Sequence, residues 1–322
     1  MVNPLSFDQG FWTFETTAAV AAGGVIAVLA ICQMVLHLRR VRRRKGRTGR
    51  QDNVVTRFRN DSPLQVAIAQ LANRGEVDTR VAAVESQKEI ARQSPQDYWS
   101  VMETFASHLR RHARVPITRT HAAANSQITK LAPDFQAILS VLLHQDTQHE
   151  SHDAALDLRN TDLSRTGLRG IFLRYADLRG AALIGTALRS ANLRDASLRA
   201  ARLNHASLRG ADLREANFSE ATLRNADLRY CDMRGVVLNN LTDLVQADLG
   251  DADLRGAILS DADCRRADLS GAKLTGTTLH GTGLSYANLR NADLQNVQLH
   301  SANLANSRFS EGQKEALAAT SN

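Results

Sequence analysis

Leucine recurs every five residues throughout the second half of the chain. Counting from Leu158 to Leu238 gives 17 five-residue units, each with an apolar centre. After a slip of one residue within 239–243, the pattern resumes at Leu244 and runs to Phe309 for 14 more units. A period of five fits neither an α-helix nor a strand. It fits a four-sided coil of 20 residues, in which each unit forms one side and each leucine points to the axis.

The interior of such a coil needs small residues beside the leucines. Leucine occupies 27 of the 31 centres, and alanine stands two positions before the centre in 19 units. Coils stacked at the strand spacing of roughly 4.8 Å would form a rod of nearly eight coils, roughly 37 Å long. Cys231 and Cys264 fall at inward positions, so we expect them to pack rather than to react.

The position just before the centre favours Asp or Asn, as in the unit Ala176-Asp177-Leu178-Arg179-Gly180. With this motif of Ala-(Asp/Asn)-Leu-X-X, the segment Leu156–Phe309 closely resembles the pentapeptide-repeat family. The resemblance implies a right-handed quadrilateral β-helix, which we place at residues 151–309. We therefore expect a mainly β fold, to which an N-terminal transmembrane helix and a small α-helical region are added.

Residues 56–150 predict that helical region. Ser62 is a helix cap followed by Pro63, and Gln65 completes a capping box. A second helix is expected at Val77–Gln93, a third from Tyr98 to His112, and a fourth at Pro133–His144. The aromatic stripe of the third helix is interpreted as core.

The helical region also looks like that of membrane-anchored bacterial pentapeptide-repeat proteins, at Val81–Val84, Ser94–Trp99 and Asp134–Ile138. We expect residues 132–150 to cover the N-terminal end of the rod. Residues 310–322 form a C-terminal cap and tail, in which Ser310–Ala319 is predicted to be a short helix. The ends of a solenoid need such covers.

A charge-free, apolar stretch of 23 residues extends from Thr16 to Leu38. As a helix it would be roughly 34 Å long, enough to cross a hydrocarbon core of about 30 Å. It is followed by a basic linker at 39–55, whereas residues 1–15 carry only acidic charges. Positive charge is retained on the cytoplasmic side, so the chain is predicted to span a bacterial inner membrane once. Residues 1–15 would lie outside and all residues after Leu38 in the cytoplasm.

The basic linker is also a candidate contact for anionic lipid headgroups. The side chains assigned to this contact are Arg39, Arg40, Arg42, Arg43, Arg44 and Lys45. Metal-capable side chains crowd the segment His144–Asp153, but their spacing matches no known site, and we interpret it as a solvated linker. No metal or cofactor is expected.

Arginine follows the centre in 12 of the first 17 units. Stacking by 20 residues sorts eight of these arginines into two outward rows. The first row is Arg169, Arg189, Arg209 and Arg229, and the second is Arg174, Arg194, Arg214 and Arg234. Several carboxylates lie near the second row, whereas the first has little beyond Asp227. The rows are either a soluble surface or a face that binds an acidic partner.

Charge and composition limit the function. The whole chain of 322 residues has a net charge of +7, and three cysteines exclude a disulfide scaffold. Residues 156–310 contain 20 basic and 17 acidic residues, a balance of +3. This balance argues against the DNA mimicry by which some family members protect a topoisomerase, because mimicry needs an acidic surface.

We find no phosphate-binding loop, nucleophile elbow or carboxylate pair of a catalytic kind. The sequence therefore predicts a non-enzymatic, membrane-anchored scaffold that binds an unidentified protein. Binding of anionic lipid or nucleic acid by the arginine rows is the alternative, although nucleic acid is disfavoured because the rod has almost no aromatic residues for stacking.

Overall fold

The computed structural model describes residues 62–73, 76–114, 132–143 and 155–313. The chain divides into two units, residues 1–69 and 70–322, and each is described by itself. Within the described residues, no helix has both the length and the apolar character that a membrane span requires. The expected span at 16–38, the basic linker and the segment 144–153 lie outside the described residues.

The first described helix, α3 (Pro63–Leu71), begins with the predicted capping box. The Ser62 N–H donates to Gln65 Oε1 at 3.1 Å, and the Gln65 N–H donates to Ser62 Oγ at 3.3 Å. Two backbone donors that a helix start leaves unpaired are thereby satisfied.

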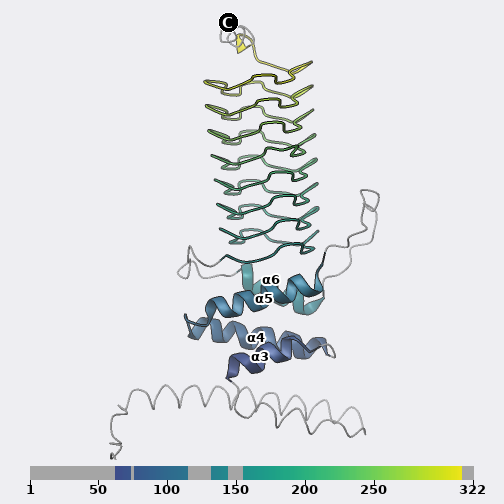
Figure 1. Ribbon diagram of the computed structural model, residues 1–322, viewed down its shortest axis with the longest axis vertical. Coiled ribbons are helices and arrows are strands. Elements are labelled where there is room, and N and C mark those ends of the chain that lie inside the picture. The colour runs from purple at the N-terminus through teal and green to yellow at the C-terminus, as the bar shows by residue number, and fades with distance from the viewer. Residues whose placement is uncertain (1–61, 74–75, 115–131, 144–154, 314–322) are drawn as a thin grey trace, which may run out of the picture. The chain divides into compact units, whose positions relative to one another are not determined.

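The second unit contains three helices, α4 (Val77–Gln93), α5 (Tyr98–His112) and α6 (Pro133–Leu143) (Figure 1). Their predicted bounds are confirmed, except that α6 ends one residue earlier. Helix α4 packs against both α5 and α6. The predicted stripe of α5 forms the core of this region, with Val101 and Phe105 fully buried.

One buried polar cluster joins all three helices. Asp134 on α6 accepts from Arg80 Nε of α4 at 2.7 Å and lies 3.2 Å from His108 Nε2 of α5. Burial alone would raise the pKa of Asp134, but the hydrogen bonds from Arg80 and His108 lower it. Burial lowers the pKa of His108. The cluster therefore fixes the relative position of the helices through a partnered carboxylate rather than through apolar contacts alone.

Residues 155–313 form the expected four-sided coil, which rises as a stack in Figure 1. Each side pairs with the side above through one parallel bridge, for example Asp157 with Asp177 and Asp177 with Ser197. We expected β structure, and the sides are single bridges separated by turns rather than extended strands. The reason is that a corner residue with positive φ, such as Asn160 at 55°, follows each centre from Leu158 to Leu304 by two positions.

The backbone of one unit, residues 177–181, shows how the stack satisfies its donors. The N–H groups of Asp177, Leu178 and Gly180 bond to carbonyls of neighbouring coils, and that of Ala181 bonds to Leu178 O. The fifth donor, Arg179 N–H, bonds to the Asp177 carboxylate at 3.2 Å. An aspartate or asparagine before the centre thus accepts the one N–H that the coil cannot pair, as in an Asx turn.

The interior of the stack is filled by side chains. From Leu158 to Leu289, every centre is buried, with 2% or less of its surface exposed. Inward threonines donate to backbone carbonyls, as Thr166 Oγ1 does to Leu163 O at 2.7 Å. Cys231 and Cys264 are buried and free, as expected, and burial raises the pKa of each thiol to about 12.

The register slip is an extra residue at one corner. Bridges connect residues 20 apart before the slip, but Thr222 pairs with Asp243, 21 residues on. Asn240 and Leu241 both have positive φ, 54° and 65°, and Leu241 is 78% exposed. The following Thr242 is buried and donates to Phe218 O at 3.0 Å. The inserted residue therefore projects outward from the corner, and the interior of the stack is not disturbed.

The end of α5 contacts the first coil. The Asp162 N–H donates to Ala113 O at 2.5 Å, and Arg114 forms an antiparallel bridge with Thr161. These contacts come from the residues after α5, whereas we expected the cover to come from 132–150. At the other end, Ser310 N–H donates to Gln313 Oε1 at 2.6 Å. Most of the helix predicted at 310–319 lies outside the described residues.

Candidate interaction surface

Seven units share one charged arrangement, which we call the intra-unit Asp–Arg pair. The aspartate before the centre accepts from the arginine after it, through Nε at 2.8–2.9 Å and Nη2 at 2.6–3.0 Å. The same aspartate accepts the arginine N–H at 3.2–3.4 Å. The pairs are Asp157–Arg159, Asp177–Arg179, Asp212–Arg214, Asp227–Arg229, Asp232–Arg234, Asp253–Arg255 and Asp263–Arg265.

These pairs perturb the carboxylates. Hydrogen bonds from the arginine side chains lower the pKa of Asp212, Asp227 and Asp253. The geometry is bidentate, with two parallel N–H donors of the guanidinium on two carboxylate oxygens. It arises because residues two apart in an extended segment project to the same side.

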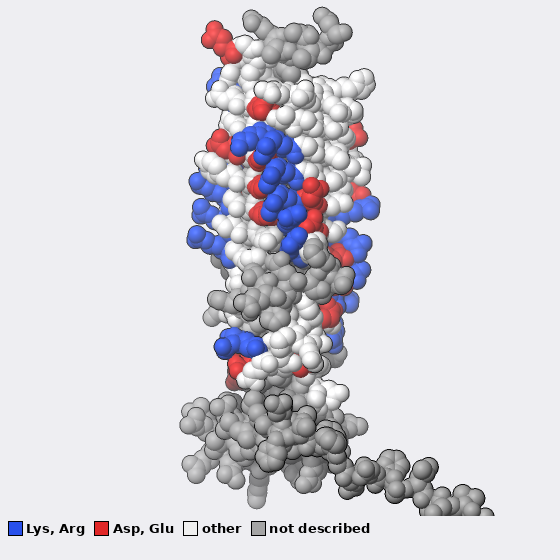
Figure 2. Space-filling view, turned by 90° about the vertical axis from the view of Figure 1, so that its left-hand side faces the viewer, with Lys and Arg blue, Asp and Glu red and all other residues white. Residues whose placement is uncertain are grey.

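Figure 2 shows the result on one side of the molecule, where Lys and Arg side chains form a vertical row with Asp and Glu on both sides of it. In the predicted second row, Arg174 and Arg194 place Nε at 3.6 and 3.3 Å from Asp195 Oδ2. Arg214 and Arg234 belong to intra-unit pairs. All four members of this row therefore contact a carboxylate, although Arg174 and Arg194 share that of Asp195.

The first row is different. Arg229 contacts Asp227 at 2.9 Å and Asp248 at 3.2 Å. No ion pair with any described residue is made by the other three arginines, Arg169, Arg189 and Arg209. Their units carry a small residue where the intra-unit pair has aspartate, namely Gly167, Ala187 and Ser207. We call these three arginines the unpaired row.

The missing aspartate also affects the backbone. The N–H groups of Arg169, Arg189 and Arg209 have no acceptor among the described residues. Arg169 and Arg189 are exposed, whereas Arg209 is half-buried beneath Tyr230, whose ring centroid lies 4.9 Å from its guanidinium carbon. Each unit of the unpaired row therefore has both a guanidinium and a backbone N–H without a carboxylate acceptor among the described residues.

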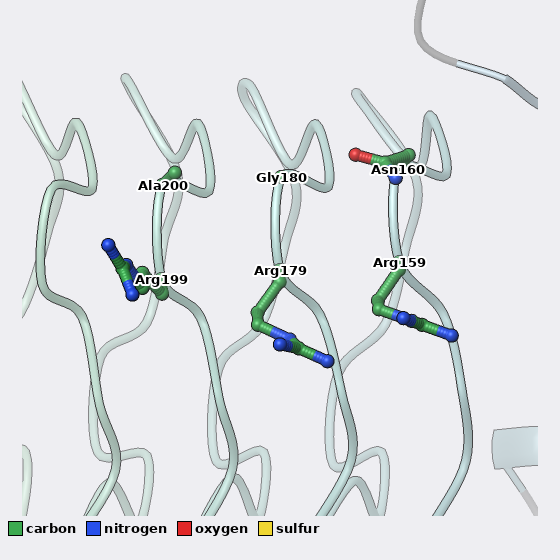
Figure 3. A pocket seen from close by; sticks show the side chains of 6 residues that line it. All are labelled: Arg159, Asn160, Arg179, Gly180, Arg199 and Ala200. Atoms are coloured by element: carbon green, nitrogen blue, oxygen red, sulfur yellow. The ribbon is translucent and has the colours of Figure 1, made fainter.

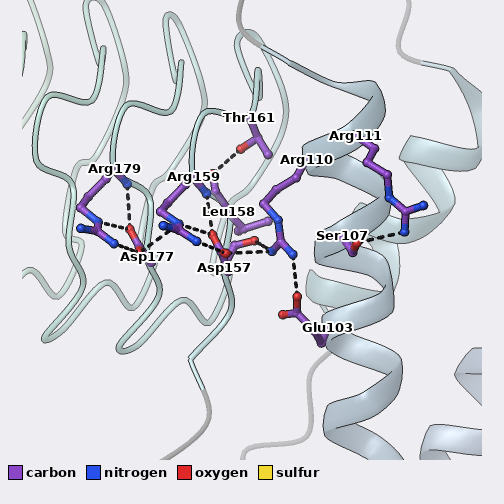
Figure 4. Close-up of polar contacts among 10 residues, drawn as sticks. All are labelled: Glu103, Ser107, Arg110, Arg111, Asp157, Leu158, Arg159, Thr161, Asp177 and Arg179. Carbon is purple, nitrogen blue, oxygen red and sulfur yellow. Dashed lines mark hydrogen bonds and ion pairs between the residues drawn. The ribbon is translucent and has the colours of Figure 1, made fainter.

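A chain of charges connects the helices to the first two coils (Figure 4). Arg110 on α5 contacts Glu103 at 2.6 Å and donates to the Asp157 carbonyl. Its Nη1 also lies 3.3 Å from the Asp157 carboxylate, which is shared with Arg159. The hydrogen bond from Arg159 is the main reason that the pKa of Asp157 falls to about 2.

A shallow, open depression of about 370 Å³ lies on the side of the first coils that carries Arg159 and Arg179 (Figure 3). Its lining is Arg159, Asn160, Arg179, Gly180, Arg199 and Ala200. The three arginines are all partnered, since Arg159 and Arg179 belong to intra-unit pairs and Arg199 contacts Glu220 at 2.7 Å. The depression therefore offers neither an enclosed volume nor a free charge.

Of the eight arginines predicted as an interaction face, the structure pairs five with carboxylates and leaves three without one, of which Arg169 and Arg189 are exposed and Arg209 is half-buried. The intra-unit pair was not predicted, although the recurrent Asp-Leu-Arg triplet is a signal for it. Among the described residues, no group of three or more metal-ligating side chains is gathered. The six basic residues from Arg39 to Lys45 lie outside the described residues.

Comparison with known proteins identifies the repeats. A family model described as pentapeptide repeats matches in 8 copies, at residues 157–195, 201–240, 247–284 and 272–311. HetL, a pentapeptide repeat protein of the cyanobacterium Nostoc involved in heterocyst differentiation regulation, is 38% identical over 47% of this chain and 71% of its own, with a TM-score of 0.43. No curated protein matches.

Two further solved structures are similar in part. A second pentapeptide repeat protein of Nostoc is 30% identical over 38% of this chain and 84% of its own, with a TM-score of 0.13. The plasmid-mediated fluoroquinolone resistance protein QnrB1 is 19% identical over 52% and 95%, with a TM-score of 0.26. Pentapeptide repeats imply a right-handed quadrilateral β-helix, which agrees with the four-sided coil described above. From the repeat match and the identity to HetL, this chain belongs to the pentapeptide-repeat family.

Proposed function

We propose that this protein is a membrane-anchored, non-enzymatic scaffold whose β-helix binds another protein. The observation that carries the proposal is the filled interior: the centres from Leu158 to Leu289 are buried, so chemistry is left to the outer surface. That surface is held by a continuous backbone hydrogen-bond network along the stack. Such a surface presents side chains at fixed spacing, which suits recognition of a partner.

The anchor in this proposal is the apolar stretch at 16–38, and the basic linker that follows would face anionic lipid. The asymmetry of charge across the stretch supports an orientation with the β-helix in the cytoplasm. The contacts between α5 and the first coil would then transmit the position of the helical region to the β-helix.

The alternative, in which the arginine rows bind lipid or nucleic acid, has less support. Phosphate binding by rows of arginine requires guanidinium groups that are available to phosphate. Five of the eight predicted arginines already contact carboxylates of the chain itself. A partner protein can instead use the mixed pattern of paired and unpaired charges.

The test is photo-crosslinking in native membranes from position 190. Ser190 is an exposed corner residue beside Arg189, and its positive φ of 56° is shared by many corner residues of the chain. We expect one discrete protein adduct that sediments with the membrane fraction. A control photoreactive residue at Gln295, on another side of the stack, should not give that adduct. Adducts only with lipid or nucleic acid, or a protein that remains soluble, would overturn the proposal.

A further inference from the structure

The unpaired row lies beside backbone donors of the kind that the intra-unit pairs satisfy internally. In the seven intra-unit pairs, one carboxylate accepts two guanidinium donors and one backbone N–H. In the three units of Arg169, Arg189 and Arg209, the same donors stand without that carboxylate. We propose that these three units bind carboxylates of a partner protein, supplied by one acidic α-helix that lies along the stack. This proposal rests on the proposed function and names the partner's chemistry.

The chain itself shows which chemical group these guanidinium and backbone N–H donors bind. Arg179 takes the Asp177 carboxylate through Nε at 2.8 Å and Nη2 at 2.6 Å, while the Arg179 N–H donates to the same group. A partner carboxylate that reaches Arg189 meets the same three donors. A planar carboxylate matches the planar fork of guanidinium, which favours Asp and Glu side chains.

Space for the incoming group is available. A Cβ placed on Gly167 or on the corner Gly170 would have no heavy atom within 4 Å. In the next two coils, Ala187 and Ser207 take the place of Gly167, and Ser190 and Gly210 take the place of Gly170. Only small residues therefore occupy the positions beside the unpaired row, and the side chains of Arg169 and Arg189 are exposed there.

The spacing of the row selects the backbone of the partner. Neighbouring coils are about 4.8 Å apart, so the row places three arginines over about 9.6 Å. Carboxylates one helical turn apart are separated by about 5.4 Å, or about 10.8 Å over two turns. Alternate residues of an extended peptide are about 6.7 Å apart, or about 13.4 Å over two steps. The mismatch is about 1 Å for a helix and nearly 4 Å for a strand, and arginine side chains adapt more easily to the former.

The row also has a defined end. Tyr230 is 52% exposed and covers Arg209, and in the next coil Arg229 is already held by Asp227 and Asp248. Carboxylates further along would repel an acidic helix that continued past this point. The partner helix is therefore expected to contact three coils and to stop near Tyr230.

The decisive variant closes the three sites from within the chain. Introducing Asp before each centre, as G167D/A187D/S207D, should create three new intra-unit pairs with the geometry seen elsewhere. The matched control S197D/T278D/Q298D adds the same charge at the same position of other units. In the unit of Ser197, the arginine after the centre is Arg199, which already contacts Glu220. In the units of Thr278 and Gln298, the residue after the centre is histidine.

The assay measures binding of the purified full-length chain in detergent to two synthetic helical peptides. Both peptides are about 20 residues long, and one carries Glu at every turn of one face where the other carries Gln. We expect preferential, salt-weakened binding of the Glu peptide, about tenfold or more loss in G167D/A187D/S207D, and retention within about twofold in the control. If the first triple variant fails to fold by circular dichroism, R169Q/R189Q/R209Q serves instead.

Several results would overturn the inference. These are unchanged binding in both site variants, an equal loss in the control, or tighter binding of an extended peptide with alternate Glu residues. Preferential binding to phosphatidylglycerol vesicles over the Glu peptide would replace the protein partner with lipid. If the adduct from position 190 persists in G167D/A187D/S207D, the unpaired row does not bind the partner, while the proposed scaffold function is retained. If the Glu peptide binds as expected but no membrane-associated protein adduct forms, the scaffold is wrong instead.

Discussion

Replacing Asp253 tests whether the residue before the centre stabilises the coil through the backbone or through charge. Asp253 Oδ1 accepts the Arg255 N–H at 3.3 Å, and the carboxylate also holds the Arg255 side chain. Asparagine can keep the first contact, since Asn192 Oδ1 accepts the Arg194 N–H at 3.2 Å. Alanine removes both contacts without changing the inward side chains.

The expected order of stability is wild type, then Asp253→Asn, then Asp253→Ala. The backbone hydrogen bond is worth about 0.5–1.5 kcal/mol, which is the predicted gap between the two variants. Solvent screens the ion pair made by the exposed Arg255 guanidinium. We therefore expect the loss of unfolding free energy from wild type to Asp253→Asn to be smaller than the further loss from Asp253→Asn to Asp253→Ala.

The assay is urea unfolding of the full chain at neutral pH, because urea does not screen the ion pair. Loss of protection from hydrogen exchange at the Arg255 amide should accompany Asp253→Ala and not Asp253→Asn. Equal destabilisation by the two variants would refute the backbone argument and assign the effect to charge. A cycle with Arg255→Ala isolates the coupling of the two side chains.

Three further predictions address the interior, the helix–coil junction and the thiols. Leu193→Ala, at a fully buried centre, should lower the free energy of unfolding by about 2–5 kcal/mol. Leu241→Ala, at the exposed corner, should change it by less than about 0.5 kcal/mol. Similar losses in the two variants would contradict the outward position of Leu241. Because the pKa of Asp157 is lowered from 3.8 to about 2, its charged form adds stability above pH 3.8 that is lost as the pH falls through 2. The stability difference between wild type and Asp157→Asn should thus shrink over that range, and a constant difference would argue against the hydrogen bond from Arg159 that lowers this pKa. Cys231 and Cys264 should resist alkylation at pH 8 in the folded chain and react after unfolding, as peptide mass spectrometry would show. Rapid labelling of either of these two residues in the native chain would refute its burial.

The sequence was informative where a single period controls the structure. The leucine repeat predicted the interior, and the capping box at Ser62 predicted the start of α3, because both depend on local spacing. The same spacing could have revealed the intra-unit pair, since Asp177 and Arg179 are two residues apart. The stacked rows alone did not predict which arginines contact an aspartate of their own unit, as Arg214, Arg229 and Arg234 do.

Contacts between distant segments could not be predicted in this way. Asp134, which lies within a segment used for the family resemblance, is buried between Arg80 and His108 from two other helices. No pattern in one helix specifies which charged residue another helix will bring to it. The contact of Arg114 with Thr161 likewise joins segments separated by a long connection.

The extra residue at Leu241 indicates how this chain can change length. Since the insertion projects at a corner, the faces before and after it stay aligned, and Asp243 still stacks between Thr222 and Asp263. Deleting a whole coil would also keep every face continuous. Deleting one five-residue unit would instead rotate all later residues by one face and divide any row that crosses the junction. Gene variants that gain or lose repeats are therefore expected to do so in steps of four units, while single-residue insertions accumulate at corners.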